Sequence, residues 1–293
     1  FVKEFLDELN PTNTGITLVH AVNPWGMKYR RRVNQNNVDL NRNFICNWVE
    51  HKSDINKYYS ELKNFLQPGK EVKKYKGLFP SFYWNTLKSL IKIGSSDLKR
   101  ATLLGQYQYP QGIYYGGDNY QESTSQMIEL YQEILSQYSQ VIHLDIHTGF
   151  GPTQEMTIVN SSLEERDSHK LQQKFSYPRI QAVNSSEFYS IQGDMIDYIY
   201  RKRGDKYPDT YYYGTCFEFG TYGQGLFPSL NSLRTMIKEN QLYWQGASDR
   251  EIMYQINKDF NRLFYPQSEE WKDKAIADFN QAVKGIFTAE GLI

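Results

Sequence analysis

Apolar and polar positions along the chain follow two periods, one typical of buried strands and one typical of helices. Short apolar, β-branched runs predict buried strands at 16–22, 141–146, 156–159 and 211–219. Apolar residues at helical spacing predict helices at 1–9, 84–94, 121–138, 161–175, 229–243, 249–264 and 268–287. Turn residues at 23–26 end the first strand, and the Gly-, Tyr- and Pro-rich stretch 95–118 predicts a loop.

The order of these elements predicts the fold class. Strands that alternate with helices indicate an α/β domain with a mixed, mainly parallel central sheet flanked by helices. No repeat, low-complexity tract or linker interrupts residues 1–293, so we expect a single domain in which residues 225–293 form a C-terminal helical part. The first helix begins without a capping residue, and the chain begins with Phe, so we expect further residues upstream of Phe1. The compartment stays open, with the cytoplasm slightly favoured.

Composition argues against several classes of partner. The 33 basic and 33 acidic residues cancel, so no net field attracts nucleic acid or an anionic membrane surface. No apolar run reaches the roughly 18 residues that a membrane helix requires. We therefore expect neither a nucleic-acid partner nor a membrane partner, and nothing indicates the oligomeric state. Two cysteines, Cys46 and Cys216, are too few for a disulfide framework, and we expect both to be ordinary buried thiols.

A basic segment carries the first candidate site residues. Three consecutive arginines, 30–32, precede the run Asn-Val-Asp-Leu-Asn-Arg-Asn-Phe at 37–44. Guanidinium groups match carboxylates in two-point geometry, so this segment is suited to holding a carboxylate or a carbonyl oxygen. We expect Arg30 and Arg31 to face solvent, as arginine runs usually do. The turn at Pro24 and the neighbouring Asp39 are expected to fix the other arginines of the segment.

Two predicted strands end in ionisable residues. His147 ends the run Asp-Ile-His before Thr-Gly, where ligands of open α/β sheets collect, and histidine is a common zinc ligand. Two alternatives remain: His147 bonds a neighbouring backbone group, or His143, Asp145 and His147 form one site, since they share a strand face.

Glu218 lies between Phe217 and Phe219. Burial among aromatic residues raises a carboxyl pKa, which suits a general base. The alternative for Glu218 is a buried ion pair with one of the arginines. The glycine-flanked tyrosines at 112–117 predict a tight loop at the rim of the site, although packing is the expected role of most tyrosines.

These segments, in this order, resemble the zinc carboxypeptidase family, most closely bacterial members with the motifs seen here at 23–26, 32–44 and 145–149. The similarity extends from about residue 16 to 224. It implies a metallopeptidase, a Zn²⁺-dependent hydrolase that cleaves a peptide or amide bond beside a free carboxylate. Residue by residue, it implies the following roles: zinc ligand for His147, general base for Glu218, carbonyl-polarising arginine for Arg32, carboxylate clamp for Asn41 and Arg42, and flexible site tyrosine for Tyr189.

The sequence departs from that family in one respect, because it contains no His-x-x-Glu motif. The resemblance therefore implies that the two other zinc ligands lie upstream of Phe1. Two other functions stay open. One is an N-acyl amino acid deacylase similar to aspartoacylases and desuccinylases, and the other is a metal-free protein that binds peptides or carboxylates. The expected partner is accordingly a peptide or an N-acyl amino acid.

Overall fold

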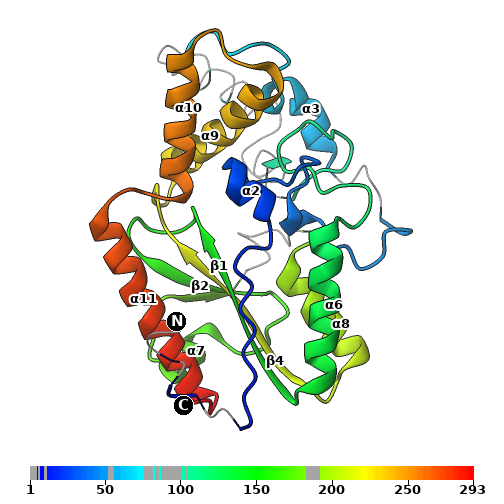
Figure 1. Ribbon diagram of the computed structural model, residues 1–293, viewed down its shortest axis with the longest axis vertical. Helices are drawn as coiled ribbons and strands as arrows, with labels where there is room; N and C mark the ends of the chain where they lie inside the picture. Colours follow the sequence, from blue (N-terminus) through cyan, green and yellow to red (C-terminus); the bar gives the residue numbers. More distant parts are fainter. Residues whose placement is uncertain are drawn as a thin grey trace.

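A β-sheet with helices on both faces forms the framework of the protein. The computed structural model describes residues 5, 7–9, 12–51, 56–75, 82, 86, 101–102, 104–182 and 192–293. Helices flank a four-stranded mixed sheet of order β1-β4-β2-β3, in which β1 and β4 are parallel, β2 and β3 are parallel, and β2 is antiparallel to β4 (Figure 1). The strands are β1 (Gln140–Thr148), β2 (Met156–Asn160), β3 (Ile180–Ala182) and β4 (Tyr211–Phe219). This confirms the predicted α/β class with a mainly parallel sheet.

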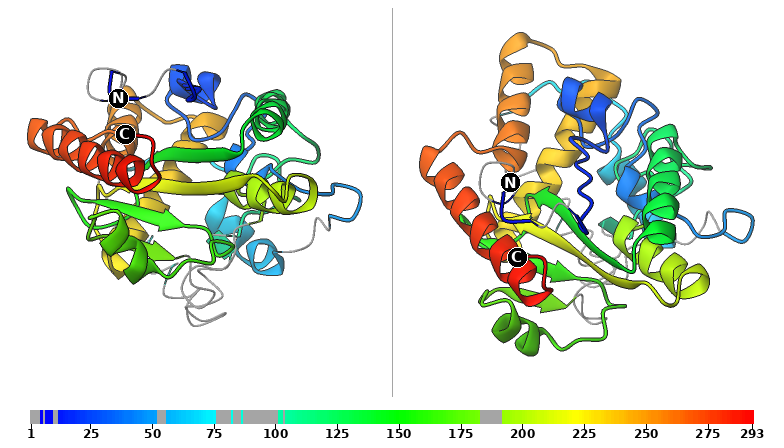
Figure 2. Two further views of the ribbon diagram at one scale, coloured as in Figure 1. Left: turned by 90° about the horizontal axis from the view of Figure 1, so that it is seen from below. Right: turned by 60° about the horizontal axis from the view of Figure 1, so that its bottom comes forward.

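The helices lie on both faces of the sheet and above its upper end (Figures 1 and 2). Their bounds are α2 (Pro24–Tyr29), α3 (Lys57–Leu66), α6 (Glu122–Gln137), α7 (Ser168–Lys174), α8 (Met195–Lys206), α9 (Leu226–Gln245), α10 (Arg250–Phe264) and α11 (Glu269–Ala289), with a short 3-10 turn η1 (Leu40–Arg42). None of the described helices is both long and apolar enough to span a membrane.

Alternation along β1 and β4 divides their side chains between two cores. Tyr213 and Phe217 of β4 are fully buried against α7 and α11, in the larger apolar cluster. Val141 and Tyr212 point to the opposite face and pack with residues of α6 and α8. His143, Asp145 and His147 follow Val141 at even spacing, so they share the face covered by α6 and α8.

Most elements with a strong periodic pattern lie where the sequence predicts them. The strands predicted at 141–146, 156–159 and 211–219 are β1, β2 and β4, and the helices predicted at 121–138, 229–243, 249–264 and 268–287 are α6, α9, α10 and α11. The helix predicted at 161–175 is shorter. Asp167 caps α7 by accepting hydrogen bonds from the N–H groups of His169 and Lys170, so the helix begins only at Ser168. The strand β3 and the helices α3 and α8 were not predicted.

The strand predicted at 16–22 is wrong. Residues 14–22 have no strand assignment, and the Leu18 side chain is 63% exposed. A segment with strand propensity forms a strand only when it pairs with another strand, and residues 16–22 pair with none of the described strands. The turn predicted at 23–26 is the start of α2, where the Asn23 side chain accepts a hydrogen bond from Gly26 N–H at 2.9 Å. The helix predicted at 84–94 lies outside the described residues apart from Thr86, and the helix predicted at 1–9 lies largely outside them.

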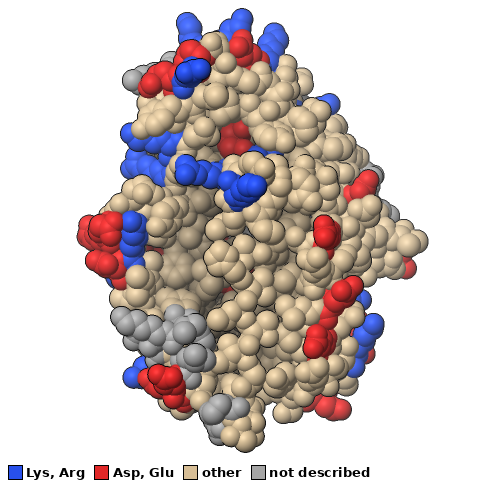
Figure 3. Space-filling model, in the orientation of Figure 1, with Lys and Arg blue, Asp and Glu red and all other residues tan. Residues whose placement is uncertain are grey.

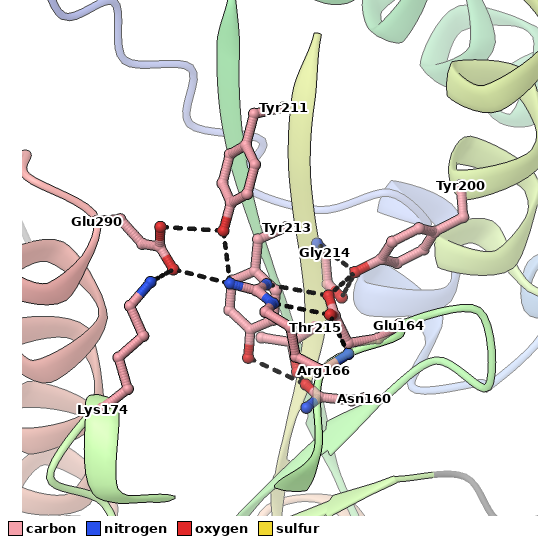
Figure 4. Close-up of polar contacts among 10 residues, drawn as sticks. All are labelled: Asn160, Glu164, Arg166, Lys174, Tyr200, Tyr211, Tyr213, Gly214, Thr215 and Glu290. Atoms are coloured by element: carbon pink, nitrogen blue, oxygen red, sulfur yellow. Dashed lines mark hydrogen bonds and ion pairs between the residues drawn. The ribbon is translucent and has the colours of Figure 1, made fainter. Parts of the chain in front are cut away.

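A charged network ties α11 to the start of β4 (Figure 4). Arg166 donates from Nε and Nη2 to the two carboxylate oxygens of Glu164, at 2.7 and 3.0 Å. Its Nη1 donates to Glu290 at 3.1 Å and to the hydroxyl of Tyr211 at 2.5 Å. Lys174 adds an ion pair to Glu290 at 2.9 Å. The two cations and two carboxylates balance, which is the condition for burying such groups.

This network predicts a specific loss of stability in acid. Burial alone raises the pKa of Glu164, but the hydrogen bonds from Arg166 and Tyr200 outweigh it and hold that pKa below its ordinary 4.5. A carboxyl whose pKa is lowered by folding stabilises the protein above its unfolded pKa and loses that contribution as the pH falls. We therefore expect Glu164→Gln to lower the free energy of unfolding at neutral pH and to weaken its decline below pH 4.5.

The measurement is urea unfolding between pH 3 and pH 7, followed by circular dichroism. Glu165→Gln is the matched control, because its side chain is exposed one residue away. Identical acid dependence in the Glu164→Gln and Glu165→Gln proteins would contradict this role for Glu164.

Candidate functional site

The register between β1 and β4 brings the predicted histidine and glutamate together. His147 is paired with Glu218, and Asp145 is paired with Cys216. In a parallel pair, directly opposed residues point to the same face, so these four side chains form one group beside α6 and α8. His147 Nε2 lies 2.7 Å from Asp145 Oδ2, and its Nδ1 lies 3.9 Å from Glu218 Oε1. One imidazole thus contacts two carboxylates.

The charged side chains in this group shift one another's pKa values. Burial lowers the pKa of His147, but the carboxylates of Asp145 and Glu218 outweigh it and raise that pKa to about 10. Burial raises the pKa of Glu218, and the nearby His147 and Arg32 only partly offset it. The pKa of Asp145 is lowered, since His147 outweighs the effect of burial. Asp145 is therefore the fixed anion that orients the ring, and Glu218 is the carboxyl better able to carry a proton.

The group also contains the donor atoms for a metal ion. Ligand atoms of His147, Cys216 and Glu218 all lie within 4.8 Å of one another. Glu218 Oε2 is buried and has no hydrogen-bond partner among the described residues, so this carboxylate oxygen is available to a ligand. Imidazole nitrogen, thiolate sulfur and carboxylate oxygen are the three ligand types that Zn²⁺ takes in proteins. The ligand types of this group are thus ones that Zn²⁺ accepts, and Asp145 would be the outer carboxylate that fixes the histidine.

The two cysteines differ from their prediction. Cys46 is exposed, and Cys216 is only partly buried and belongs to the candidate site. Burial and the neighbouring Glu218 raise the pKa of the Cys216 thiol, which keeps it protonated at neutral pH. Neither cysteine is an ordinary buried thiol.

His143 does not join this group as a ligand. Its Nε2 lies 2.8 Å from the hydroxyl of Tyr131, and its Nδ1 lies 2.9 Å from the hydroxyl of Tyr212. Both ring nitrogens are thus occupied, and burial lowers the pKa of His143, which keeps the ring neutral. The alternative of a site formed by His143, Asp145 and His147 together is wrong for this reason.

Arg32 approaches the site from the basic segment. Its Nε donates to Asp39 Oδ2 at 2.9 Å, and Asp39 is almost fully buried while Arg32 keeps 29% of its side chain exposed. Arg32 lies close enough to Glu218 to lower the pKa of that carboxyl. The expectation that Asp39 fixes Arg32 is confirmed. Glu218 has its ion-pair contact with His147, and the salt bridge of Arg32 goes to Asp39 instead, so the described ion pairs do not include one between Glu218 and an arginine.

Arg42 and Asn41 are held firmly beside this pair. Arg42 is 3% exposed, and its Nη1 donates to the Asn41 carbonyl at 2.8 Å. Its own carbonyl accepts a hydrogen bond from the Tyr107 hydroxyl at 2.7 Å. Asn41 Oδ1 accepts from Met195 N–H, so its amide nitrogen is the atom suited to contacting a ligand. The charge of Arg32 lowers the pKa of Arg42, beyond the effect of burial, which places the two guanidinium groups near each other.

The arginine run does not lie as predicted. Arg30 is exposed, as expected, but Arg31 is buried. Arg31 Nε donates to Glu239 at 2.6 Å, and its Nη2 contacts Asn37 and Asn240, both at 3.2 Å. The ion pair with a carboxylate of α9 therefore accounts for the burial of this arginine. Tyr189 lies outside the described residues.

Two further residues belong to the site although their individual importance was not predicted. Tyr114 lies between the arginines, with its ring centroid 5.7 Å from the guanidinium carbon of Arg32 and 6.0 Å from that of Arg42. Asp194 caps α8, and burial and Asp197 raise its pKa to about 6. Asp145 and His147 also influence this pKa, which places Asp194 beside the β1 group. The capping pattern Asp-Met-Ile-Asp at 194–197 is the sequence signal that indicates this helix start.

Comparison with known proteins gives a family without an assigned activity. The sequence model of a family described as "Protein of unknown function (DUF2817)" matches residues 1–278. No curated protein and no solved structure matches the chain.

The contact between Asp145 and His147 predicts a measurable pKa change. In Asp145→Asn the main charge that favours the imidazolium is removed, so we expect the pKa of His147 to fall by about 1–3 units. Histidine NMR titration of the metal-free protein measures it, with the exposed Asp209→Asn as control. An unchanged His147 titration in Asp145→Asn would exclude the contact.

Proposed function

The chain belongs to the DUF2817 family, and we propose that it is a metal-dependent hydrolase that cleaves a peptide or amide bond next to a free carboxylate. One observation carries this proposal. His147 and Glu218 face each other at the ends of β1 and β4, with the unsatisfied Oε2 of Glu218 and the guanidinium of Arg32 beside them. A proton-accepting carboxyl, a metal ligand and an anion-stabilising cation at one point are the parts that amide hydrolysis requires.

Zn²⁺ is the ion that this donor set suits. His147 is the proposed ligand, with Cys216 as a further donor within reach. When bound, zinc supplies a Lewis acid and lowers the pKa of water toward about 7. A catalytic zinc site takes about three protein ligands, so the proposal requires further ligands in addition to His147.

Glu218 is the proposed general base. Its raised pKa suits removal of a proton from the attacking water and delivery of that proton to the leaving amine. Oε1 lies toward His147, while Oε2 has no hydrogen-bond partner among the described residues. Oε2 is therefore the oxygen better placed to accept a proton.

The arginines are proposed to act on opposite ends of the reacting group. Arg32 is held by Asp39 through Nε and stays 29% exposed, so its terminal nitrogens can donate to the oxyanion that forms on the substrate carbonyl. Arg42, with the amide nitrogen of Asn41, would hold the free carboxylate of the substrate by two-point contact. Fixing both ends orients the carbonyl toward the attacking water.

Replacing the base tests the assignment of Glu218. Glu218→Gln removes the proton acceptor at nearly constant shape, so we expect kcat to fall about 10²–10⁴-fold on peptide substrates. Zinc content after dialysis should stay at the wild-type level. Glu165→Gln, at an exposed glutamate, is the control for the charge change. Retained turnover would exclude Glu218 as the base, and loss of zinc would make Glu218 a ligand instead.

Changing the clamp tests the substrate class. Arg42→Lys keeps the charge but loses the two-point contact, so we expect KM for substrates with a free carboxylate to rise roughly 10–100-fold. Amidated substrates should be unaffected. Assaying peptides beside N-acyl amino acids separates a peptidase from a deacylase. An equal change on free and amidated substrates would contradict the clamp.

A further inference from the structure

Three aromatic rings, of which Trp25 is half-buried and the other two are exposed, lie on α2 and at the end of α9. Trp25 and Tyr29 of α2 have ring centroids 4.8 Å apart, and Trp25 meets Tyr243 of α9 edge to face at 6.5 Å. Tyr29 is 54% exposed and Tyr243 is 47% exposed. We refer to Trp25, Tyr29 and Tyr243 as the aromatic platform. Tyrosine and tryptophan present apolar faces with polar edges and are enriched at binding surfaces.

A buried arginine holds the Tyr243 ring of the platform in place. The guanidinium carbon of Arg31 lies 3.6 Å from the centroid of the Tyr243 ring, which is close cation–π contact. Arg31 in turn is buried and is fixed by Glu239 and Asn240 of the same helix. Side chains that are already ordered lose little conformational entropy when a ligand binds. The exposed faces of the platform are thus prepared for a partner.

The platform is continuous with the candidate site. Arg31 lies under Tyr243, and the next residue, Arg32, contacts Asp39 and lies near Glu218. The Asn23 side chain joins the two parts, because it caps α2 through Gly26 and donates to the Arg32 carbonyl at 3.1 Å. The arginine that supports Tyr243 and the arginine beside Glu218 are thus neighbours in the chain, about 3.8 Å apart at their Cα atoms, and each residue of an extended peptide spans about 3.3 Å.

Charge around the platform indicates the chemistry of its partner. The α2 helix carries Lys28 and is followed by Arg30, both exposed, and its first turn has no acidic residue. In the space-filling view, Lys and Arg side chains border a hollow in this face at the height of α2 (Figure 3). Arg31 is neutralised by Glu239, so Lys28 and Arg30 supply the exposed positive charge of this segment. This charge attracts a negatively charged substrate such as a peptide with a free carboxyl end, and the ring faces suit an apolar side chain.

We propose that the aromatic platform binds a large apolar or aromatic side chain of a peptide substrate, two to three residues on the amino-terminal side of the bond that is cleaved. This inference rests on the proposed function, since the free carboxylate at Arg42 and the carbonyl at Arg32 set the direction of the peptide. The hydrolase accordingly prefers carboxylate-terminated peptides with a bulky residue at that distance.

Binding measurements test the platform independently of turnover. Two sets of labelled peptides with free carboxyl ends differ only by Phe or Ala, two or three residues before the last peptide bond. Their dissociation constants are measured by fluorescence polarisation in the Glu218→Gln protein. We expect Trp25→Ala and Tyr29→Ala to weaken binding of the Phe peptides about three- to tenfold and to leave the Ala peptides unchanged.

Matched controls separate the platform from general effects. Tyr254→Ala removes a tyrosine of α10 that is 58% exposed, and it should change neither set. Tyr243→Phe keeps the ring and should retain the preference for Phe peptides. Equal weakening of Phe and Ala peptides, or no weakening, would overturn the inference. Self-association of the protein that Tyr29→Ala abolishes would also overturn it, because a second copy of the chain would then cover the platform.

The outcomes also distinguish this inference from the proposed function. Phe-selective binding that depends on Trp25, without hydrolysis of any peptide by the wild-type protein, would support the platform and contradict the hydrolase. Hydrolysis with no preference for Phe, unchanged by Trp25→Ala, would support the hydrolase and overturn the platform.

Discussion

The parallel register of β1 and β4 is the constraint on which the candidate site depends. Nine consecutive pairs, from Gln140 opposite Tyr211 to Thr148 opposite Phe219, fix which side chains meet. A slip of one residue in β4 would turn Glu218 toward α7 and α11 and Phe217 toward the site. The first change buries a carboxylate among apolar residues, and the second removes a fully buried aromatic ring from the core. Apolar packing on one face thus sets the polar geometry on the other.

The arginines near the site lie outside the sheet, and ion pairs with buried carboxylates hold them in position. Arg31 is paired with Glu239, and Arg32 is paired with Asp39. Pairs of this kind contribute little net stability, but removing one partner costs about 3–5 kcal/mol, because the other charge is left buried. Their effect here is to fix the conformation of one loop. Two neighbouring arginines of the same run consequently have different surroundings, one under the aromatic platform and one beside Glu218.

The sequence predicted what depends on local pattern and on general rules of α/β sheets. Strong periodicity located β1, β4 and the helices α6, α9, α10 and α11. The rule that ligands collect at the carboxyl ends of strands led to His147, and the aromatic surroundings of Glu218 led to that residue; the structure brings the two together.

What depends on distant partners could not be read from the pattern. The three arginines at 30–32 are identical in type, and the burial of Arg31 is decided by Glu239, 208 residues later. Residues 16–22 have strand composition, but they pair with none of the described strands, not even with the edge strand β1. The sequence predicted only a packing role for Cys216. Its position opposite Asp145 depends on the pairing of two distant strands, which a local pattern does not reveal.

The network around Arg166 has a consequence for the order of folding. Arg166 and Glu290 are separated by 124 residues, and Tyr211 and Glu290 by 79. Until α11 has been synthesised and docked, the cation near the start of β4 lacks one of its two carboxylates, and the sheet face that α11 covers stays in water. Contacts of such long sequence separation form late, since the entropy cost of closing the loop comes before the contact contributes any free energy. Docking of α11 therefore covers this sheet face only after all four strands have been synthesised, and an emerging chain must keep that apolar face from other chains until residue 290 has left the ribosome.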